Sequence, residues 1–211
     1  MRGRSVDLSR DILLPAGISF YTFQTLSYVI DIYRKKLTHE THFGYYALYV
    51  SFFPQLVAGP IERPGNLLPQ LKQENAFYPE NLLPGFFQML IGFFKKLVVA
   101  DYLARFVDAS FAAPELVQGP GVALAACLFA IQIYCDFSGY CDIAAGVARM
   151  LGIRLMKNFD RPYLAGSIRE FWHRWHLSLT SWFTDYIYIP LGGSRKGIWR
   201  QICNVLVVFF I

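Results

Sequence analysis

The chain has 211 residues, of which 55% are hydrophobic, 17% aromatic and only 17% charged, and its formal net charge is +5. This charged fraction argues against an ordinary soluble domain, and the aromatic content excludes a disordered chain. A disulfide-stapled secreted module is also excluded, because there are only four cysteines and no CxxC pair. The composition therefore indicates an integral membrane protein or a piece of one.

A membrane-spanning helix needs about 20 apolar residues, and three uncharged runs come close to this length. They are residues 12–30, 43–61 and 116–135. A fourth run, 81–94, is shorter and spans only if it tilts, re-enters or extends past Lys95 and Lys96. Residues 201–211 are uncharged too, and we expect the sequence to stop in the middle of a helix.

Proline and glycine interrupt these runs, for example at Pro15, Pro54, Gly59 and Pro84. Backbone groups that such residues free must be satisfied by protein or by a water-lined cavity, because lipid offers no hydrogen bonds. The expected fold class is therefore all-α: a polytopic helical membrane protein with broken or re-entrant helices around an internal cavity.

Basic clusters lie at residues 34–36, 95–96, 149–174 and 195–200. The positive-inside rule assigns all of them to the cytoplasmic side, yet only the run 116–135 separates the second cluster from the third. Either that run is re-entrant, or the segment 140–151 also crosses, or one cluster faces outward. Because the basic residues flank apolar segments, they favour contact with lipid headgroups and acidic ligands, and nucleic acid is not an expected partner.

Residues 158–195 hold the densest mixture of aromatic and charged side chains. Ser167 and Glu170 have the spacing of a capping box, which predicts a helix that begins after Ser167. One continuous helix would place four side chains on a single face: Arg169, Trp172, His173 and His176. Two interpretations remain open. The segment is an aromatic belt at the membrane interface, or it is a catalytic site in which His176 removes a proton from a hydroxyl nucleophile.

The other polar residues of this segment have less specific patterns. His173 and His176 lack a third ligand nearby, so no metal site is expected. Asp185 is predicted to pair with a nearby arginine. Ser178, Thr180 and Ser181 are expected to form hydrogen bonds, because no GxSxG elbow surrounds them.

Carboxylates also occur at the ends of two apolar runs. Asp136 and Asp142 must be paired or face a cavity, and we expect Arg149 or Arg154 as their partner, with a role as general acid and base as the alternative. The passage FFPQLVAGPIER predicts a helix that ends in a fixed turn, with its Glu and Arg, residues 62 and 63, at the water boundary. Cys135 and Cys141 are interpreted as small packing residues.

Five long passages follow one another along the chain: PAGISFYTFQTLSYVIDIYR, FFPQLVAGPIER, GFFKKLVVAD, QIYCDFSGYCDIAAG and REFWHRWHLSLTSWFTDYIYIPLGGSR. From about residue 14 to residue 211 the chain resembles the membrane-bound O-acyltransferase family, in its alginate O-acetylation branch. The resemblance implies a multi-pass protein of the bacterial inner membrane with a central tunnel. It implies transfer of an acetyl group from a cytoplasmic donor, acetyl-CoA or an acyl carrier, to an exported polysaccharide, with periplasmic partner proteins and no tightly bound cofactor.

The resemblance carries over one catalytic residue, His176, at the RWH step, and it identifies no residue that binds substrate or cofactor. The family's principal histidine is expected after the segment that resembles residues 204–211, and its first helices before residues 15–34. We therefore expect residues 1–211 to form a partial domain that is inactive alone. The alternatives are D-alanyl transfer to teichoic acid by a related branch, a transporter or channel, and a non-catalytic truncated membrane protein.

Overall fold

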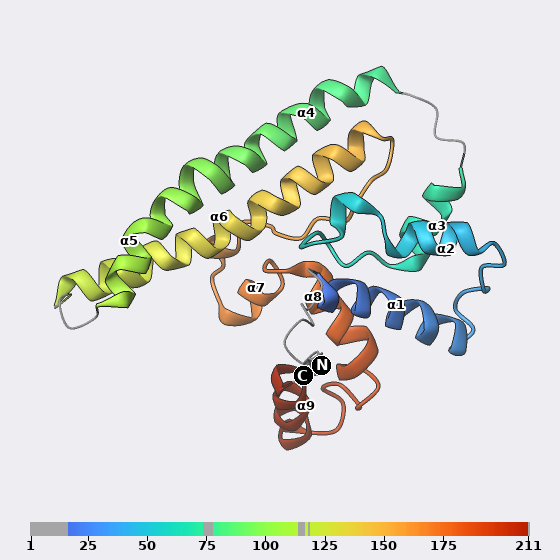
Figure 1. The fold of residues 1–211 in the computed structure, drawn as a ribbon. Coiled ribbons are helices and arrows are strands. Elements are labelled where there is room, and N and C mark those ends of the chain that lie inside the picture. Colours follow the sequence, from blue (N-terminus) through green and yellow to red (C-terminus); the bar gives the residue numbers. More distant parts are fainter. Residues whose placement is uncertain (1–16, 74–77, 114–116, 118, 211) are drawn as a thin grey trace, which may run out of the picture.

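The computed structural model describes residues 17–73, 78–113, 117 and 119–210, and every regular element in these ranges is a helix (Figure 1). The all-α expectation is confirmed for this part of the chain, whereas the expectations for residues 1–16 lie outside it. Two of the described helices are long and apolar enough to cross a membrane by length and composition, Pro79–Ala112 and Pro120–Met150.

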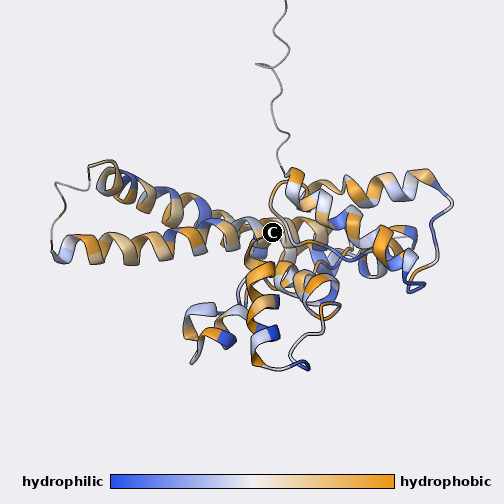
Figure 2. Ribbon diagram, turned by 90° about the horizontal axis from the view of Figure 1, so that it is seen from below, coloured by the Kyte–Doolittle hydropathy of each residue, from blue (hydrophilic) through white to orange (hydrophobic). Residues whose placement is uncertain are grey.

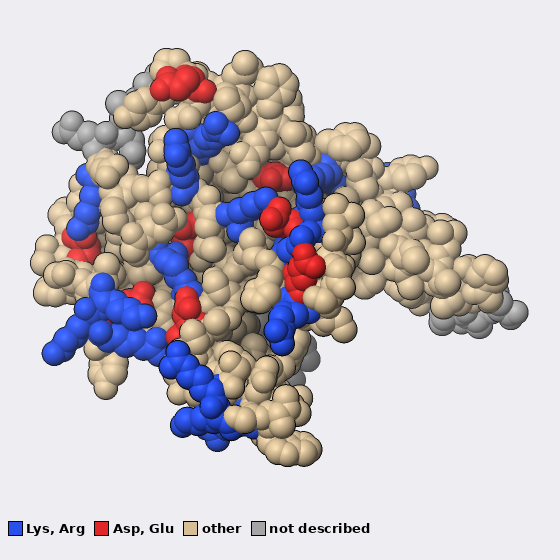
Figure 3. All heavy atoms as spheres, turned by 180° about the vertical axis from the view of Figure 1, so that it is seen from behind, with Lys and Arg blue, Asp and Glu red and all other residues tan. Residues whose placement is uncertain are grey.

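These two helices form a long hairpin. The first arm comprises α4 (Pro79–Phe93), the π-helical segment η2 (Phe94–Ala100) and α5 (Asp101–Ala112), and the second arm is α6 (Pro120–Met150). The arms run side by side in opposite directions (Figure 1). Apolar residues are distributed along both arms, and on the face seen in Figure 3 the projecting end of the hairpin is largely uncharged (Figure 2, Figure 3). Such an exposed apolar surface suits lipid as its surroundings.

Two pairs of glycines let the arms approach each other closely. A Cβ atom on Gly92 would lie 2.5 Å from the carbonyl oxygen of Gly139, and one on Gly85 would lie 2.7 Å from that of Gly146. Helices in membranes associate through such small residues, because close backbone contact replaces the hydrophobic driving force. Glycine at these positions is therefore a packing requirement of the hairpin.

Ion pairs also join the arms. Lys95 Nζ lies 2.6 Å from Asp142 Oδ2, and Lys96 pairs with Asp136 and, at 3.1 Å, with Asp101. The expectation that Arg149 or Arg154 pairs with Asp136 and Asp142 is thus wrong. The partners come from the other arm, because the antiparallel packing brings η2 against the middle of α6.

The hairpin also shows the structural setting of Lys95 and Lys96. The helix that contains residues 81–94 extends past both lysines, as one of the alternatives required. The two lysines lie within this arm and pair with carboxylates of α6. Residues 140–151 are not a separate crossing, since α6 continues unbroken through Tyr140 to Met150.

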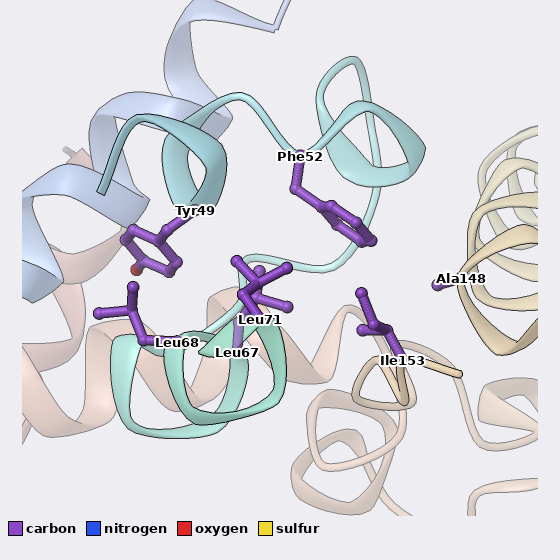
Figure 4. Packing of buried hydrophobic residues seen from close by; sticks show 7 residues of the cluster. All are labelled: Tyr49, Phe52, Leu67, Leu68, Leu71, Ala148 and Ile153. Carbon is purple, nitrogen blue, oxygen red and sulfur yellow. The ribbon is translucent and has the colours of Figure 1, made fainter. Parts of the chain in front are cut away.

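The C-terminal end of α6 packs against the main hydrophobic core. Gly152 has φ +80°, and its N–H donates to Arg149 O while that of Ile153 donates to Ala148 O, which together form a Schellman motif. Ala148 and Ile153 then join the main core cluster with residues of α2 (Phe43–Val50) and α3 (Pro64–Lys72). Figure 4 shows this cluster: Tyr49, Phe52, Leu67, Leu68, Leu71, Ala148 and Ile153.

The run 43–61 is not one helix. It contains α2, the short 3-10 helix η1 (Phe53–Gln55) and an irregular segment, because Pro54 and the Gly59–Pro60 step interrupt the backbone hydrogen bonds. The preceding run forms α1 (Ile18–Tyr33), which packs against α2 and α3. The expectation of broken helices is confirmed here.

The expectation that residue 62 lies at the water boundary is wrong. Glu62 is fully buried, and its carboxylate accepts hydrogen bonds from the backbone N–H of Met156 and, at 2.6 Å, from Asn66 Nδ2. The segment after α6 folds back over the turn and covers this side chain. Burial raises the pKa of Glu62, and the two hydrogen bonds oppose the effect only in part.

The remaining elements follow α6 and surround the site. They are η4 (Pro162–Leu164), α7 (Ile168–Trp172), α8 (Leu177–Phe183), the π-helical η5 (Thr184–Tyr188) and α9 (Ile198–Phe210). α8 is joined to α1 by a hydrogen bond of 2.9 Å from Trp182 Nε1 to Phe23 O.

Candidate active site around His176

The predicted continuous helix through residues 168–176 is wrong, because the backbone turns between α7 and α8. Ser167 caps α7 as expected, since its Oγ accepts a hydrogen bond of 3.1 Å from Glu170 N. The extended segment 158–160 then pairs with the turn: Asp160 N donates to Arg174 O, and Leu177 N donates to Asn158 O, both at 2.9 Å. These bonds replace helical ones and separate the two helices.

His176 occupies the point where the backbone turns. Its φ of +46° is in the left-handed region, which residues other than glycine rarely adopt, and it is the N-cap residue of α8. Strain of this kind persists only where surrounding contacts impose it, and it is common at functional sites. The backbone thus holds the imidazole in a defined direction.

Aromatic rings enclose the imidazole. The centroids of the Phe137 and Phe20 rings lie 4.6 and 6.3 Å from that of His176, and Phe159 lies at 6.4 Å. On its polar edge, Nδ1 lies 3.1 Å from Asn158 Oδ1 and 3.4 Å from Ser178 Oγ. Burial among these rings lowers the pKa of His176 from 6.5 to about 4, so the imidazole is neutral at pH 7.

His176 lines an apolar cavity of about 730 Å³ between α1, α7, α8, η5 and α9. The rings of Trp172 and Phe209, 5.4 Å apart, bring α7 and α9 together beside this cavity. Its wall consists mainly of aromatic and aliphatic side chains: Phe23, Trp172, Trp175, Leu179, Phe183, Tyr188, Val205, Val208 and Phe209, with Arg169, His173, His176, Thr180 and Thr184 as the polar members.

The four side chains predicted to share one helical face therefore line one cavity, although two separate segments supply them. Arg169 is exposed at this cavity and forms no ion pair within the described part of the chain, whereas Arg174 is bound to Glu170. A free guanidinium beside a neutral imidazole can stabilise negative charge that develops on a reacting oxygen.

The other sequence predictions for this region have clear outcomes. Asp185 pairs with an arginine, as expected, although that residue is the distant Arg63, whose Nη2 lies 3.0 Å from Asp185 Oδ2. Ser178, Thr180 and Ser181 all donate hydrogen bonds, as predicted. Asp185 and Ser178 contribute to the structure around the cavity, and neither lines it.

Asn158 is the residue that sequence reasoning missed, whereas Cys141 is buried, as its interpretation as a packing residue predicts. Asn158 is buried, its Oδ1 contacts His176 and Ser178, and its Nδ2 donates to Cys141 Sγ at 3.3 Å. It lies 18 residues before His176 in the sequence, so no local pattern joins the two.

The described residues contain no group of three or more His, Cys, Asp or Glu side chains that could hold a metal ion. The arrangement offers an apolar cavity, a neutral, half-buried imidazole and a guanidinium that has no ion-pair partner among the described residues. Such a set suits proton transfer from a hydroxyl group and stabilisation of an oxyanion.

Comparison with known proteins assigns this architecture to a family. The family model for the membrane-bound O-acyltransferases matches residues 33–211. The chain is 40% identical to the probable alginate O-acetylase AlgI of Pseudomonas aeruginosa, an alignment that covers 95% of this chain and 38% of that protein. It is 37% identical to the peptidoglycan O-acetyltransferase of Helicobacter pylori, over 95% of this chain and 43% of that protein.

A more distant similarity extends to a different acyl group. The chain is 27% identical to the teichoic acid D-alanyltransferase of Bacillus subtilis, over 82% of this chain and 44% of that protein. In all these alignments the chain spans about two-fifths of the length of the curated relatives that it matches.

Proposed function

The chain belongs to the membrane-bound O-acyltransferase family, and we propose that the complete protein transfers acetyl groups to hydroxyls of an exported polysaccharide such as alginate. The observation that carries this proposal is the neutral, half-buried His176 on the wall of a large apolar cavity. Greater identity to O-acetylating relatives, 40% and 37%, than to the D-alanyltransferase, 27%, favours acetyl as the transferred group.

The reaction we propose begins with an acetyl thioester in the cavity. The neutral imidazole of His176 accepts the proton of an acceptor hydroxyl while that oxygen attacks the thioester carbonyl. A new C–O ester bond forms, the C–S bond breaks, and the sulfur leaves as a thiolate that takes up the proton from the imidazolium. No other co-reactant is needed.

Arg169 is the group that we assign to the developing oxyanion. It lines the same cavity as His176 and has no ion-pair partner among the described residues. A guanidinium beside this apolar wall can donate hydrogen bonds to the negative oxygen that develops in the reaction. The aromatic wall also keeps water away from the thioester, which limits hydrolysis.

We propose that the protein lies in the inner membrane and crosses it several times. The exposed apolar surface of the hairpin α4–α6 supports contact with the lipid bilayer (Figure 2). The donor that we propose is acetyl-CoA or an acyl carrier, and periplasmic acetyltransferases are the proposed partners that complete the transfer to the polysaccharide. These proposals rest on the family resemblance.

The test is acyl transfer by membranes that contain the complete gene product. Labelled acetyl-CoA and a D-alanyl carrier thioester are supplied in parallel, and label in polysaccharide is counted after removal of lipid and protein. Incorporation of acetyl but not of D-alanine supports the proposal. D-alanine incorporation alone assigns the protein to the D-alanyl branch, and ion flux without any transfer indicates a transporter instead.

A further inference from the structure

The segment between α6 and η4 holds Asn158 rigidly beside the candidate active site. The side chain is only 3% exposed. Its backbone carbonyl accepts the N–H of Leu177, and two residues later Asp160 N donates to Arg174 O. Asn158 is therefore fixed to both sides of the turn that carries His176.

The contacts of its amide group determine which end faces His176. Asn158 Oδ1 lies 3.1 Å from the backbone nitrogen of Ser178. A backbone N–H can only donate, so the atom that it faces must be the oxygen. The opposite end of the amide donates to Cys141 Sγ, which is buried in α6. This orientation follows from the chemistry of the partners.

The oxygen in turn determines where the proton of His176 lies. Oδ1 can only accept, and it lies 3.1 Å from Nδ1, so Nδ1 carries the hydrogen. The hydroxyl of Ser178 donates to the same oxygen at 2.9 Å. Nε2 then keeps the lone pair, and it has no hydrogen-bond partner within the described residues.

We propose that Asn158 is a positioning residue that holds His176 in its Nδ1–H tautomer and so presents Nε2 as the base of the acyl transfer. The tautomer of a histidine is set by the hydrogen bond that its other nitrogen makes. This inference rests on the proposed function for the role of Nε2, whereas the tautomer itself is a property of the structure.

Nitrogen NMR measures the tautomer without reference to activity. The complete gene product is labelled with ¹⁵N-histidine in detergent micelles, and the signals of His176 are assigned by their loss in His176→Gln. We expect Nδ1 to resonate as a protonated nitrogen and Nε2 as an unprotonated one. A proton on Nε2 in the wild-type protein overturns the proposal at once.

Variants separate the contribution of Asn158 from general packing. Asn158→Ala removes the acceptor, so we expect a mixture of tautomers and a roughly 10- to 100-fold loss in kcat with little change in KM. Ser178→Ala, the matched control, removes a hydroxyl that lies 3.4 Å from Nδ1 but leaves Asn158 Oδ1 at 3.1 Å from that nitrogen, so the Nδ1–H tautomer remains. If Asn158→Ala retains the wild-type tautomer or the wild-type kcat, Asn158 does not position the base.

Asn158→Asp keeps an acceptor in the same place and decides the question if the alanine variant does not fold. A carboxylate at this position stabilises the imidazolium, so the acid limb of the kcat/KM profile moves to higher pH while Nδ1 remains protonated. An unmoved acid limb in an active Asn158→Asp enzyme contradicts the proposal. If the wild-type protein transfers no acyl group, the proposed function fails, and the NMR result still answers whether Asn158 sets the tautomer.

Discussion

Lys95 Nζ lies 2.6 Å from Asp142 Oδ2, and this ion pair joins the two arms of the hairpin beside the pair of Lys96 with Asp136. Each side chain is 27% exposed, so the pair is only partly accessible. Removal of one partner leaves a carboxylate without compensation in apolar surroundings, which costs more than the pair itself contributes.

Lys95→Met should therefore destabilise the complete protein by more than about 1 kcal/mol, whereas Lys95→Met combined with Asp142→Leu should recover most of the loss. Thermal unfolding in detergent measures both. Lys36→Met is the matched control, because Lys36 is exposed and forms no ion pair within the described residues. Equal loss in the single and double variants would show that the pair is not what stabilises the hairpin.

The glycine contacts of the hairpin predict that the same substitution, glycine to alanine, changes stability differently at two positions. Gly92→Ala places a Cβ 2.5 Å from Gly139 O, so the arms must separate, at a cost of roughly 1–3 kcal/mol. Gly65→Ala in α3 meets no atom within 4 Å and should leave stability unchanged or slightly higher. The thermal midpoints of the two variants give the comparison, and similar midpoints would contradict close packing at Gly92.

The buried carboxylate of Glu62 predicts a dependence of stability on pH. Its pKa is raised in the folded protein, so the folded state holds the proton more tightly than the unfolded state does. The stability that this proton contributes is fully present below the unfolded pKa of about 4.3, and it is lost as the pH rises through the folded pKa. Glu62→Gln should flatten this part of the profile of unfolding free energy against pH, and an unchanged slope would exclude Glu62 as its source.

The sequence predicted the parts of this structure that have local patterns. Ser167 caps α7 at the expected spacing, and the Gly–Pro step breaks the run 43–61 where proline chemistry requires. The catalytic role of His176 was assigned from the RWH motif that carries the family resemblance, and it stays a prediction. In each case the residues that determine the feature are neighbours along the chain.

The sequence failed where distant segments decide the outcome. Lys95 and Lys96 have the pattern of a membrane boundary, and only the antiparallel packing of α6 shows that they neutralise Asp142 and Asp136. Glu62 is followed by an arginine at the end of an apolar run, which is typical of a boundary, yet the segment after α6 covers it. Asn158 has no local signal for its contact with His176.

The lowered pKa of His176 predicts the pH below which kcat/KM falls. A general base must be neutral, so kcat/KM should fall only as the pH approaches the pKa of about 4. An unperturbed histidine would lose activity near pH 6.5. Initial rates of acetyl transfer between pH 4 and 8, corrected for enzyme that denatures, distinguish the two. A limb near pH 6.5 would mean that His176 is solvated during the reaction or is not the base.

The central claim is that His176 is a catalytic base, and one measurement tests it most directly. Acetyl transfer from labelled acetyl-CoA is compared between the wild-type complete protein, His176→Ala and His39→Ala at equal amounts in the membrane. His39 is exposed and does not line the cavity, so His39→Ala should retain wild-type transfer. The account predicts that His176→Ala loses at least about 100-fold in kcat. Wild-type transfer by His176→Ala would remove this residue from the mechanism.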